Sequence, residues 1–368
     1  MEKTENSKSL FQLKIDYLQF MVQLLDWHDP NIILIIYALL MERKKITQKE
    51  LMDLTGLSRS TISETLSLLI NDPRGIPVLK TRKRGDSRNY YYLPLKFPDY
   101  IKRMFGGALK AIAFNLDFVP ALLKRCKALT PQNEKVIHTK DFMAFFYKYN
   151  YYIRVVMNPY EACLEAYFEN PENPPSLKEF ISESDLTLDI TRQLQYEKAP
   201  IPENDNLDQI KRDFMEEMLK LGQGSGTGTN KDLAYTFFML FMDKDPITQE
   251  EIRHVTGSRR AAISEALTLL ARQKFVTIVK KPNDRKKYYT PSSSLQSFMS
   301  TRIQLSRHKI NQIKLIMNSR FIPELEQIHA DPDEKKFMRE FFEDTAYYFG
   351  ILANYMSDVF NFIVAQLS

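Results

Sequence analysis

The chain contains one sequence unit twice, and this repeat constrains the fold more than any other feature. Residues 46–94 run from ITQ through TG to ISETLSLL, and residues 247–291 run from ITQ through TG to ISEALTLL. Each copy continues into a basic stretch that closes on adjacent tyrosines with a proline nearby. A repeated unit sets the architecture of a chain, because each copy folds in a similar way. Two copies in one chain predict an intramolecular pseudo-dimer.

Each copy predicts a helix-turn-helix followed by a β-hairpin. Apolar residues recur at helical spacing over 48–71, Gly56 allows a tight turn, and Ser58 is the expected N-cap of the second helix. Two short β segments, at 78–82 and 89–93, flank a Gly-Asp tip and predict the hairpin. The second copy predicts the same elements. Helical spacing over the rest of the chain predicts a mainly α fold, with long helices flanking two winged helix-turn-helix domains that carry small β-hairpin wings.

The repeat divides the chain into two domains, for which 368 residues are sufficient. We expect a first winged-helix domain with flanking helices over 1–168 and a second over 207–368. Prolines mark the linker between them, 169–206, in which a short helix is expected near 177–183. The glycine-rich segment 222–230 lacks the G-K-[ST] ending of a phosphate loop, so we interpret it as an inter-helix loop.

Positive charge gathers at two equivalent places, although the net charge of +5 is modest. Each predicted hairpin contains five cationic residues and one aspartate. These are Lys80, Arg82, Lys83, Arg84 and Arg88 against Asp86, and Lys280, Lys281, Arg285, Lys286 and Lys287 against Asp284. Clustered cations of this kind are typical of a nucleic-acid contact surface.

The second helix of each copy has a polar face that suits the major groove of DNA, where its first turn would reach base edges. A solvated helix face and a charged turn would explain the same residues, but both features occur in both copies, which favours double-stranded DNA as the partner. The candidate DNA-binding residues are Ser58, Arg59, Ser60, Thr61, Ser63, Lys83, Arg84, Arg88, Arg259, Arg260, Ser264, Arg285, Lys286 and Lys287.

The segments Ser58–Leu69 (SRSTISETLSLL) and Gly85–Tyr91 (GDSRNYY) resemble the winged-helix regulators of the MarR superfamily, and most closely its GbsR-like branch. The resemblance implies groove contacts from 58–63 and 259–264 and wing contacts from Arg88 and Arg285. Members of the family are typically dimers of one such unit, whereas the repeat makes this chain a tandem fusion of two units. In the second copy, Arg259 stands at the place of Ser58 and Pro282 at the place of the wing glycine.

Aromatic residues that follow each copy at matching spacing form a candidate effector site. Such clusters can surround a cation, and the resemblance implies a small-molecule effector. Ordinary helix packing between the two halves explains the same pattern and is the favoured interpretation. The candidate residues are Phe146, Tyr151, Tyr152, Phe342, Tyr347 and Tyr348.

No catalytic or metal-binding motif is evident, so neither an enzyme nor a cofactor is expected. The five histidines are scattered, and the two cysteines, Cys126 and Cys163, are expected to be reduced and buried. The longest apolar run, 32–41, is short for a membrane-spanning helix, and the N-terminus has no secretory signal. These features predict a cytoplasmic protein without a membrane partner.

The sequence therefore predicts a sequence-specific DNA-binding transcription regulator, in which two winged helices of one chain read two half-sites. The alternative is a winged-helix scaffold for protein–protein interaction, in which the acidic residues of 161–217 bind a basic partner. The sequence does not specify the operator, the regulated genes, activation or repression, or the effector. It leaves open whether the halves pair within one chain or between chains, and whether they assemble further.

Overall fold

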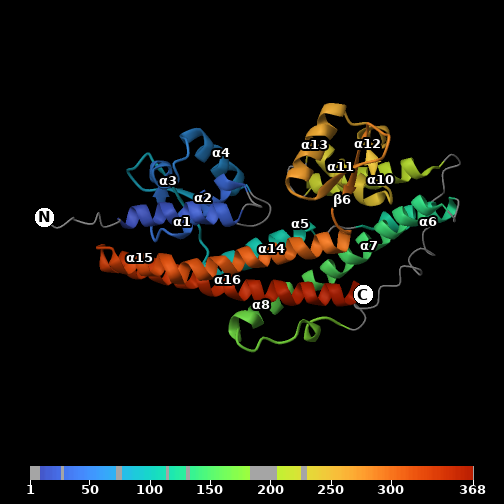
Figure 1. Cartoon of the computed structure of the whole chain (residues 1–368). Helices are drawn as coiled ribbons and strands as arrows, with labels where there is room; N and C mark the ends of the chain where they lie inside the picture. Colours follow the sequence, from blue (N-terminus) through green and yellow to red (C-terminus); the bar gives the residue numbers. More distant parts are fainter. Residues whose placement is uncertain are drawn as a thin grey trace. The chain divides into compact units, whose positions relative to one another are not determined.

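The computed structural model describes residues 9–25, 29–71, 77–112, 116–129, 133–182, 205–224 and 230–367. These residues form a mainly α fold with two small antiparallel sheets, as the sequence predicts (Figure 1). They divide into two compact units. Unit 1 consists of Met1–Ala108, Tyr160–Ser176 and Ile303–Val359, and unit 2 consists of Leu109–Pro159, Leu177–Arg302 and Phe360–Ser368.

Unit 1 contains the first helix-turn-helix and its hairpin. Its elements are α1 (Leu10–Leu24), α2 (Pro30–Leu40), β1 (Ile46–Thr47), α3 (Gln48–Thr55), α4 (Arg59–Ile70), β2 (Leu79–Arg82), β3 (Asn89–Tyr92) and the start of α5 (Phe97–Ile112). The strand order is β1-β3-β2, so the hairpin is extended by a third strand of two residues. The sequence does not predict this strand, because two residues are too short to show an alternating pattern.

Unit 2 repeats this order. Its elements are α10 (Leu207–Gly224), α11 (Lys231–Met242), β4 (Ile247–Thr248), α12 (Gln249–Thr256), α13 (Arg260–Arg272), β5 (Val276–Lys280), β6 (Lys287–Pro291) and the start of α14 (Leu295–Ile316). The second sheet has the order β4-β6-β5. The two units are therefore similar helix–helix–hairpin structures, consistent with tandem winged-helix domains.

The same local interactions define the helix-turn-helix in both units. Thr47 and Glu50 form a capping box at the start of α3, and Thr248 and Glu251 form its counterpart at the start of α12. Burial alone would raise the pKa of both glutamates, but hydrogen bonds from the backbone and hydroxyl of each threonine lower it. Each short helix ends at a glycine in the left-handed conformation, Gly56 with φ 70° and Gly257 with φ 67°.

The remaining helical segments flank the two winged helices, as the sequence predicts. They are α6 (Val119–Ala128), α7 (Glu134–Met157), α8 (Tyr160–Glu169), η1 (Leu177–Glu179), a π-helical turn η3 (Met317–Phe321), α15 (Ile322–Gln327) and α16 (Pro332–Leu367). Asn158 and Pro159 separate α7 from α8, and the expected helix near 177 is the single turn η1. Most of the predicted linker, 183–204, and most of the glycine-rich loop, 225–229, lie outside the described residues.

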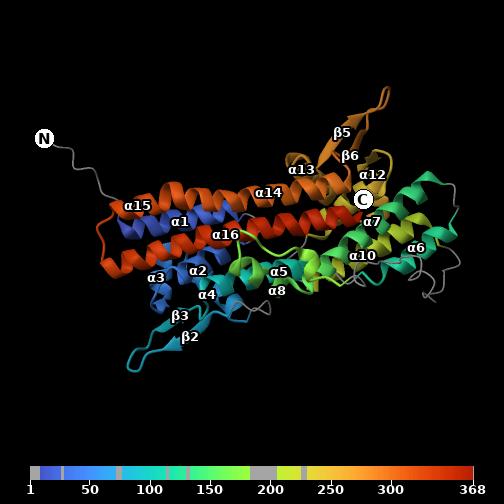
Figure 2. The same cartoon turned by 90° about the horizontal axis from the view of Figure 1, so that it is seen from below.

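The winged helix of unit 1 packs on helices from the end of the chain. The ring of Tyr17 in α1 lies 5.5 Å from Phe321 and 5.3 Å from Phe342, centroid to centroid. Lys14 Nζ binds Glu42 Oε1 at 2.8 Å and Glu334 Oε1 at 2.9 Å, and its side chain is 5% exposed. Figures 1 and 2 show α1 alongside α15 and α16. The first helix of this unit is thus held by residues more than 300 positions away.

The winged helix of unit 2 packs on helices from the first half of the chain. The Phe214 ring in α10 lies 5.8 Å from Phe142 and 6.0 Å from Phe146, both in α7. Arg125 of α6 binds Asp205 at 2.7 Å and Asp213 at 2.6 Å. These contacts mirror those of unit 1, so each winged helix is completed by trailing helices of the other half.

This exchange differs from the predicted domains 1–168 and 207–368, which follow chain order. The compact units instead assign 303–359 to the first winged helix and 109–159 to the second. The physical reason is that the two copies and their trailing helices are alike. The apolar face of α7 or α16 therefore fits either winged helix, and helical periodicity carries no information about which one it contacts.

Two further expectations concern single side chains and membrane spans. Cys126 and Cys163 are free and buried, as predicted. Burial raises the pKa of each thiol to about 11, which keeps both in the neutral form. None of the helices in the described part of the chain is long and apolar enough to cross a membrane.

The exchange predicts that the two halves fold only together. We expect fragments 1–182 and 205–368 to be unfolded or aggregated when produced separately, because each lacks the helices that cover its winged helix. Produced together, they should co-purify with the helical content of the intact chain, measured by circular dichroism. If each fragment alone forms a folded monomer, the exchange is wrong.

Phe342 and Tyr347 on α16 provide a matched pair for this test. Phe342 is fully buried against Tyr17, whereas Tyr347 is 45% exposed. Phe342→Ala should lower the free energy of unfolding by about 3–5 kcal/mol and weaken association of the fragments, and Tyr347→Ala should change both much less.

A buried ion pair gives a second prediction about stability. Lys211 Nζ binds Asp243 Oδ2 at 2.7 Å, with side chains only 3% and 7% exposed. Lys211→Ala should lower the free energy of unfolding, measured in urea, by about 3–5 kcal/mol, because it leaves a buried carboxylate without its partner. Lys220→Ala, which removes the exposed pair with Glu217, is the control and should have little effect. Equal losses in the two variants would contradict the assigned role of the buried pair.

Candidate nucleic-acid interface

The second helix of each helix-turn-helix separates an apolar face from a polar one. In α4, Ile62, Leu66 and Leu69 are buried, and in α13, Ile263, Leu267 and Leu270 are buried. Seven of the eight predicted groove residues of these two helices are exposed, and Thr61 is half-buried. The predicted polar surfaces of α4 and α13 therefore face away from the core of their own units.

The first turns of the two helices differ in how they are capped. Ser58 Oγ accepts a hydrogen bond from Thr61 N–H at 3.2 Å and lies 2.8 Å from Ser60 Oγ. Arg259 takes the N-cap position of α13 and provides no side-chain acceptor. The first turn of α13 therefore lacks the acceptor that Ser58 supplies in α4, and cationic side chains lie beside it.

The tip of the first wing is organised by one carboxylate. Asp86 accepts hydrogen bonds from the backbone N–H and the guanidinium of Arg88, and from the Tyr90 hydroxyl at 2.7 Å. The Arg88 and Tyr90 hydrogen bonds hold the pKa of Asp86 well below its usual value of 3.8. Lys83 Nζ lies 4.4 Å from the centre of the Tyr90 ring. Gly85, with φ 81°, makes the turn.

The second wing is organised in the same way. Asp284 accepts from Lys286 N–H at 2.8 Å and from the Tyr288 hydroxyl at 2.7 Å, and these two hydrogen bonds lower its pKa. Lys281 Nζ lies 4.1 Å from the centre of the Tyr288 ring. Both wings therefore present cations around an Asp–Tyr pair. Figure 2 shows each hairpin extending from the helices of its own unit.

These contacts correct the predicted alignment of the two wings. Lys286, not Arg285, is the counterpart of Arg88, because its N–H binds the turn aspartate. Asn283, with φ 61°, takes the place of Gly85, which the sequence pattern assigns to Pro282. Asparagine tolerates the left-handed conformation better than most residues, so the turn is kept without a glycine. Among the wing candidates, Lys83, Arg84, Arg88, Arg285, Lys286 and Lys287 are all exposed.

The aromatic residues proposed as an effector site are divided between the units, three in each. In unit 2, Phe146 stacks on Phe142, and the Tyr151 and Tyr152 rings contact each other. In unit 1, Phe342 is buried and the Tyr347 and Tyr348 rings lie 5.0 Å apart. Phe146 and Phe342 thus pack against the first helix of a winged helix, as ordinary packing predicts. Effector binding by these residues stays a prediction.

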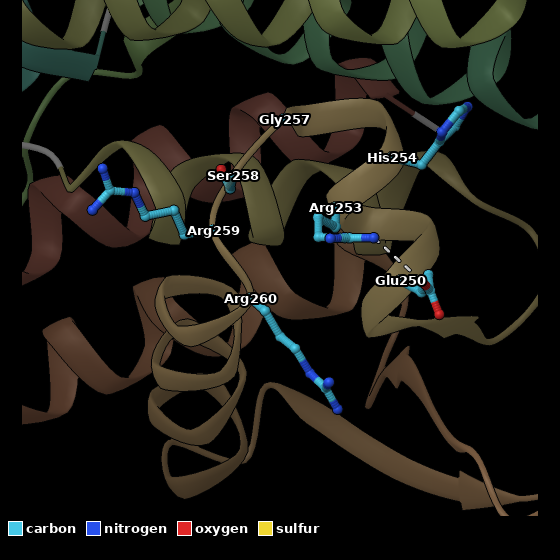
Figure 3. A pocket seen from close by; sticks show the side chains of 7 residues that line it. All are labelled: Glu250, Arg253, His254, Gly257, Ser258, Arg259 and Arg260. Atoms are coloured by element: carbon cyan, nitrogen blue, oxygen red, sulfur yellow. Dashed lines mark hydrogen bonds and ion pairs between the residues drawn. The ribbon is translucent and has the colours of Figure 1, made fainter.

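Two shallow depressions in unit 2 adjoin the predicted interface. The first surrounds the turn before α13 (Figure 3), and its lining residues are Glu250, Arg253, His254, Gly257, Ser258, Arg259 and Arg260. The second lies beside the wing and includes Lys135, Lys281, Lys286 and Tyr288. The sequence patterns did not indicate Arg253 or His254 as interface residues, although both lie just before the turn in the sequence. Lys135 could not be predicted there, because α7 reaches this winged helix only through the exchange.

Metal-binding residues do not gather anywhere in the described ranges, where no three His, Cys, Asp or Glu side chains are arranged to hold an ion. Comparison of the chain with protein-family models gives no match, and no curated protein matches it either.

The Asp–Tyr arrangement predicts that the turn carboxylate orders each wing. Asp86→Ala should increase amide hydrogen exchange at Arg88 by on the order of tenfold, because the N–H loses a charge-assisted acceptor. Asp284→Ala should do the same at Lys286, and Ser87→Ala is the control. Since the pKa of Asp86 is depressed, the protection should be complete above pH 3.8 and be lost only as the pH falls through the lower folded value. Unchanged exchange in both aspartate variants would contradict this role.

Proposed function

We propose that the protein is a sequence-specific transcription regulator that binds double-stranded DNA through its two winged helices. The observation that carries the proposal is the repetition of the wing tip. Both tips use the same aspartate–tyrosine pair, in Asp86 with Tyr90 and Asp284 with Tyr288, and both surround it with exposed cations. One aspartate–tyrosine pair is enough to stabilise a turn. Turn stability does not explain why five cations lie beside that pair in both copies.

The physical chemistry of DNA recognition supports the division of roles between helix and wing. The first turn of α4 offers hydroxyls and the Arg59 guanidinium, and that of α13 offers the Arg260 guanidinium; both kinds of group hydrogen-bond to base edges in the major groove. Wing cations such as Lys83, Arg84 and Arg88 neutralise phosphates or enter the minor groove, which positions the protein without reading sequence. A chain with two such surfaces reads two half-sites, and its unlike halves favour an operator that is not a perfect palindrome.

The resemblance of Ser58–Leu69 and Gly85–Tyr91 to the GbsR-like branch of the MarR superfamily supports the same function. The winged-helix topology fits that resemblance, and the tandem fusion distinguishes this chain from a dimer of single units. We therefore assign the chain to this class of regulators as part of the proposal.

The proposal predicts different effects for a wing residue and a groove residue. Arg88→Ala should weaken binding to all duplexes and make the dependence on salt less steep, because it removes a cation that neutralises a phosphate. Arg59→Ala should also relax base preference by about 1–3 kcal/mol at one position, measured by selection from a random duplex pool.

Lys336→Ala is the control for both variants, since it removes an exposed cation on α16, outside the wings and helix-turn-helices. Duplex binding by the parent that is weak and independent of salt would argue against DNA as the partner. It would favour the alternative of a protein-interaction scaffold. Wild-type binding by both Arg88→Ala and Arg59→Ala would show that these surfaces are wrongly assigned.

A further inference from the structure

The surface around the start of α13 in unit 2 is more basic than the matching surface of unit 1. The match between the units is fixed by the two capping boxes, which begin at Thr47 and Thr248, and by the left-handed Gly56 and Gly257. Under this match five of the seven lining positions differ between the units, and two of them, Glu250 in place of Lys49 and Ser258 in place of Leu57, add no cation. Arg253 replaces Met52, His254 replaces Asp53, and Arg259 replaces Ser58, while Arg260 matches Arg59. Three guanidinium groups therefore surround this turn in unit 2, against one in unit 1.

The cations of this depression are available to a ligand. Arg259 and Arg260 are exposed and make no ion pair with any residue that the structure describes. Arg253 pairs only with Glu250, at 3.2 Å, and both side chains are more than half exposed. Figure 3 shows Arg259 and Arg260 leaving the start of α13 in different directions, with Arg253 extending toward Glu250. The guanidinium groups therefore point away from the turn in different directions.

A second group of cations continues this surface toward the wing. Lys135, Lys281 and Lys286 line the neighbouring depression, and Glu250 borders both depressions. Lys135 lies at the start of α7, where Asn133 caps the helix. At the start of α16 in unit 1, Asp331 has the same capping role, and the next charged residues are Asp333 and Glu334. The start of α7 thus brings Lys135 to unit 2 beside Glu134, whose carboxylate pairs with Lys244, whereas the first two charged residues of α16 are both acidic.

The first turns of α4 and α13 also differ in their hydroxyl groups, and here unit 1 has more than unit 2. At the first turn of α4, Ser60 and Thr61 carry hydroxyls, and the matching residues of α13 are Ala261 and Ala262. A methyl group cannot distinguish the donor and acceptor patterns of base edges, whereas a hydroxyl can hydrogen-bond to them. Unit 1 is therefore better equipped to read bases, and unit 2 to bind phosphates.

We propose that unit 2 anchors the protein on the sugar–phosphate backbone through Arg253, Arg259 and Lys135, while unit 1 supplies most of the sequence preference. This inference rests on the proposed DNA binding. Contacts to phosphates are the same for every sequence and release counterions, so they set affinity and its dependence on salt. Contacts to base edges set specificity.

The test exchanges residues between the matching positions of the full-length protein. Arg253→Met, His254→Asp and Arg259→Ser together install the residues of unit 1 in unit 2. This variant should bind every duplex more weakly, and the slope of log K against log salt should become less steep by roughly 0.9 for each phosphate that is no longer neutralised. Its base preference, selected from a random duplex pool, should stay that of the parent. Arg259→Ser alone is the fallback if the triple variant melts at a lower temperature.

The matched variant changes unit 1. Ser60→Ala and Thr61→Ala together install the residues of unit 2, and they should alter base preference while leaving the salt slope unchanged. The inference is overturned if the unit 2 variant keeps the parent's salt slope or changes base preference. In that case DNA binding itself still stands. If the parent protein binds no duplex at either low or high salt, the proposed function fails and this inference fails with it.

Discussion

The packing of the first helix of each winged helix on aromatic residues of the other half holds this structure together. Tyr17 lies among Phe321, Phe341 and Phe342, and Phe214 lies beside Phe142 and Phe146. Edge-to-face contacts of this kind stabilise beyond the area that they bury. A buried lysine accompanies each cluster, Lys14 in unit 1 and Lys211 in unit 2. A buried ammonium group requires its carboxylate partners, so it also fixes how the helices align.

The exchange gives each half of the sequence a share in both candidate interfaces. The helix-turn-helix and wing of unit 2 come from the second half, but α7 of the first half brings Lys135 to its surface. The start of α16 likewise places Asp333 and Glu334 in unit 1. The charge of the unit 2 interface therefore depends on Lys135, which lies far from its recognition helix in the sequence. A substitution in a trailing helix can change the electrostatics of a winged helix encoded by the other copy.

Local sequence signals were sufficient to predict the helices and strands of each winged helix. They were insufficient to predict which trailing helices pack on each winged helix. Gly56 and Ser58 predicted the helix boundaries because capping and left-handed turns depend on neighbouring residues only. The sequence pattern assigned the wrong counterpart to Arg88. It aligned Pro282 with the wing glycine Gly85, whereas Asn283 adopts the required left-handed φ. The exchange of α7 and α16 could not be predicted, since two similar copies offer equivalent apolar faces and periodicity does not distinguish them. Lys135 joins the basic surface only through that exchange, whereas Arg253 belongs to the helix-turn-helix itself and could have been identified from the sequence.

Because of the exchange, the order of synthesis affects which unit of the nascent chain can complete its packing first. Proteins are made from the N-terminus, and domains fold as their residues leave the ribosome. The helices that cover the winged helix of unit 2, α6 and α7, are made before it, so all of this unit except Phe360–Ser368 can assemble once the residues up to Arg302 have emerged. Unit 1 needs residues 303–359, and its winged helix must wait for nearly the whole chain. The winged helix that is translated second is therefore the first to reach its final packing, and the one translated first is the longest exposed to chaperones and proteases.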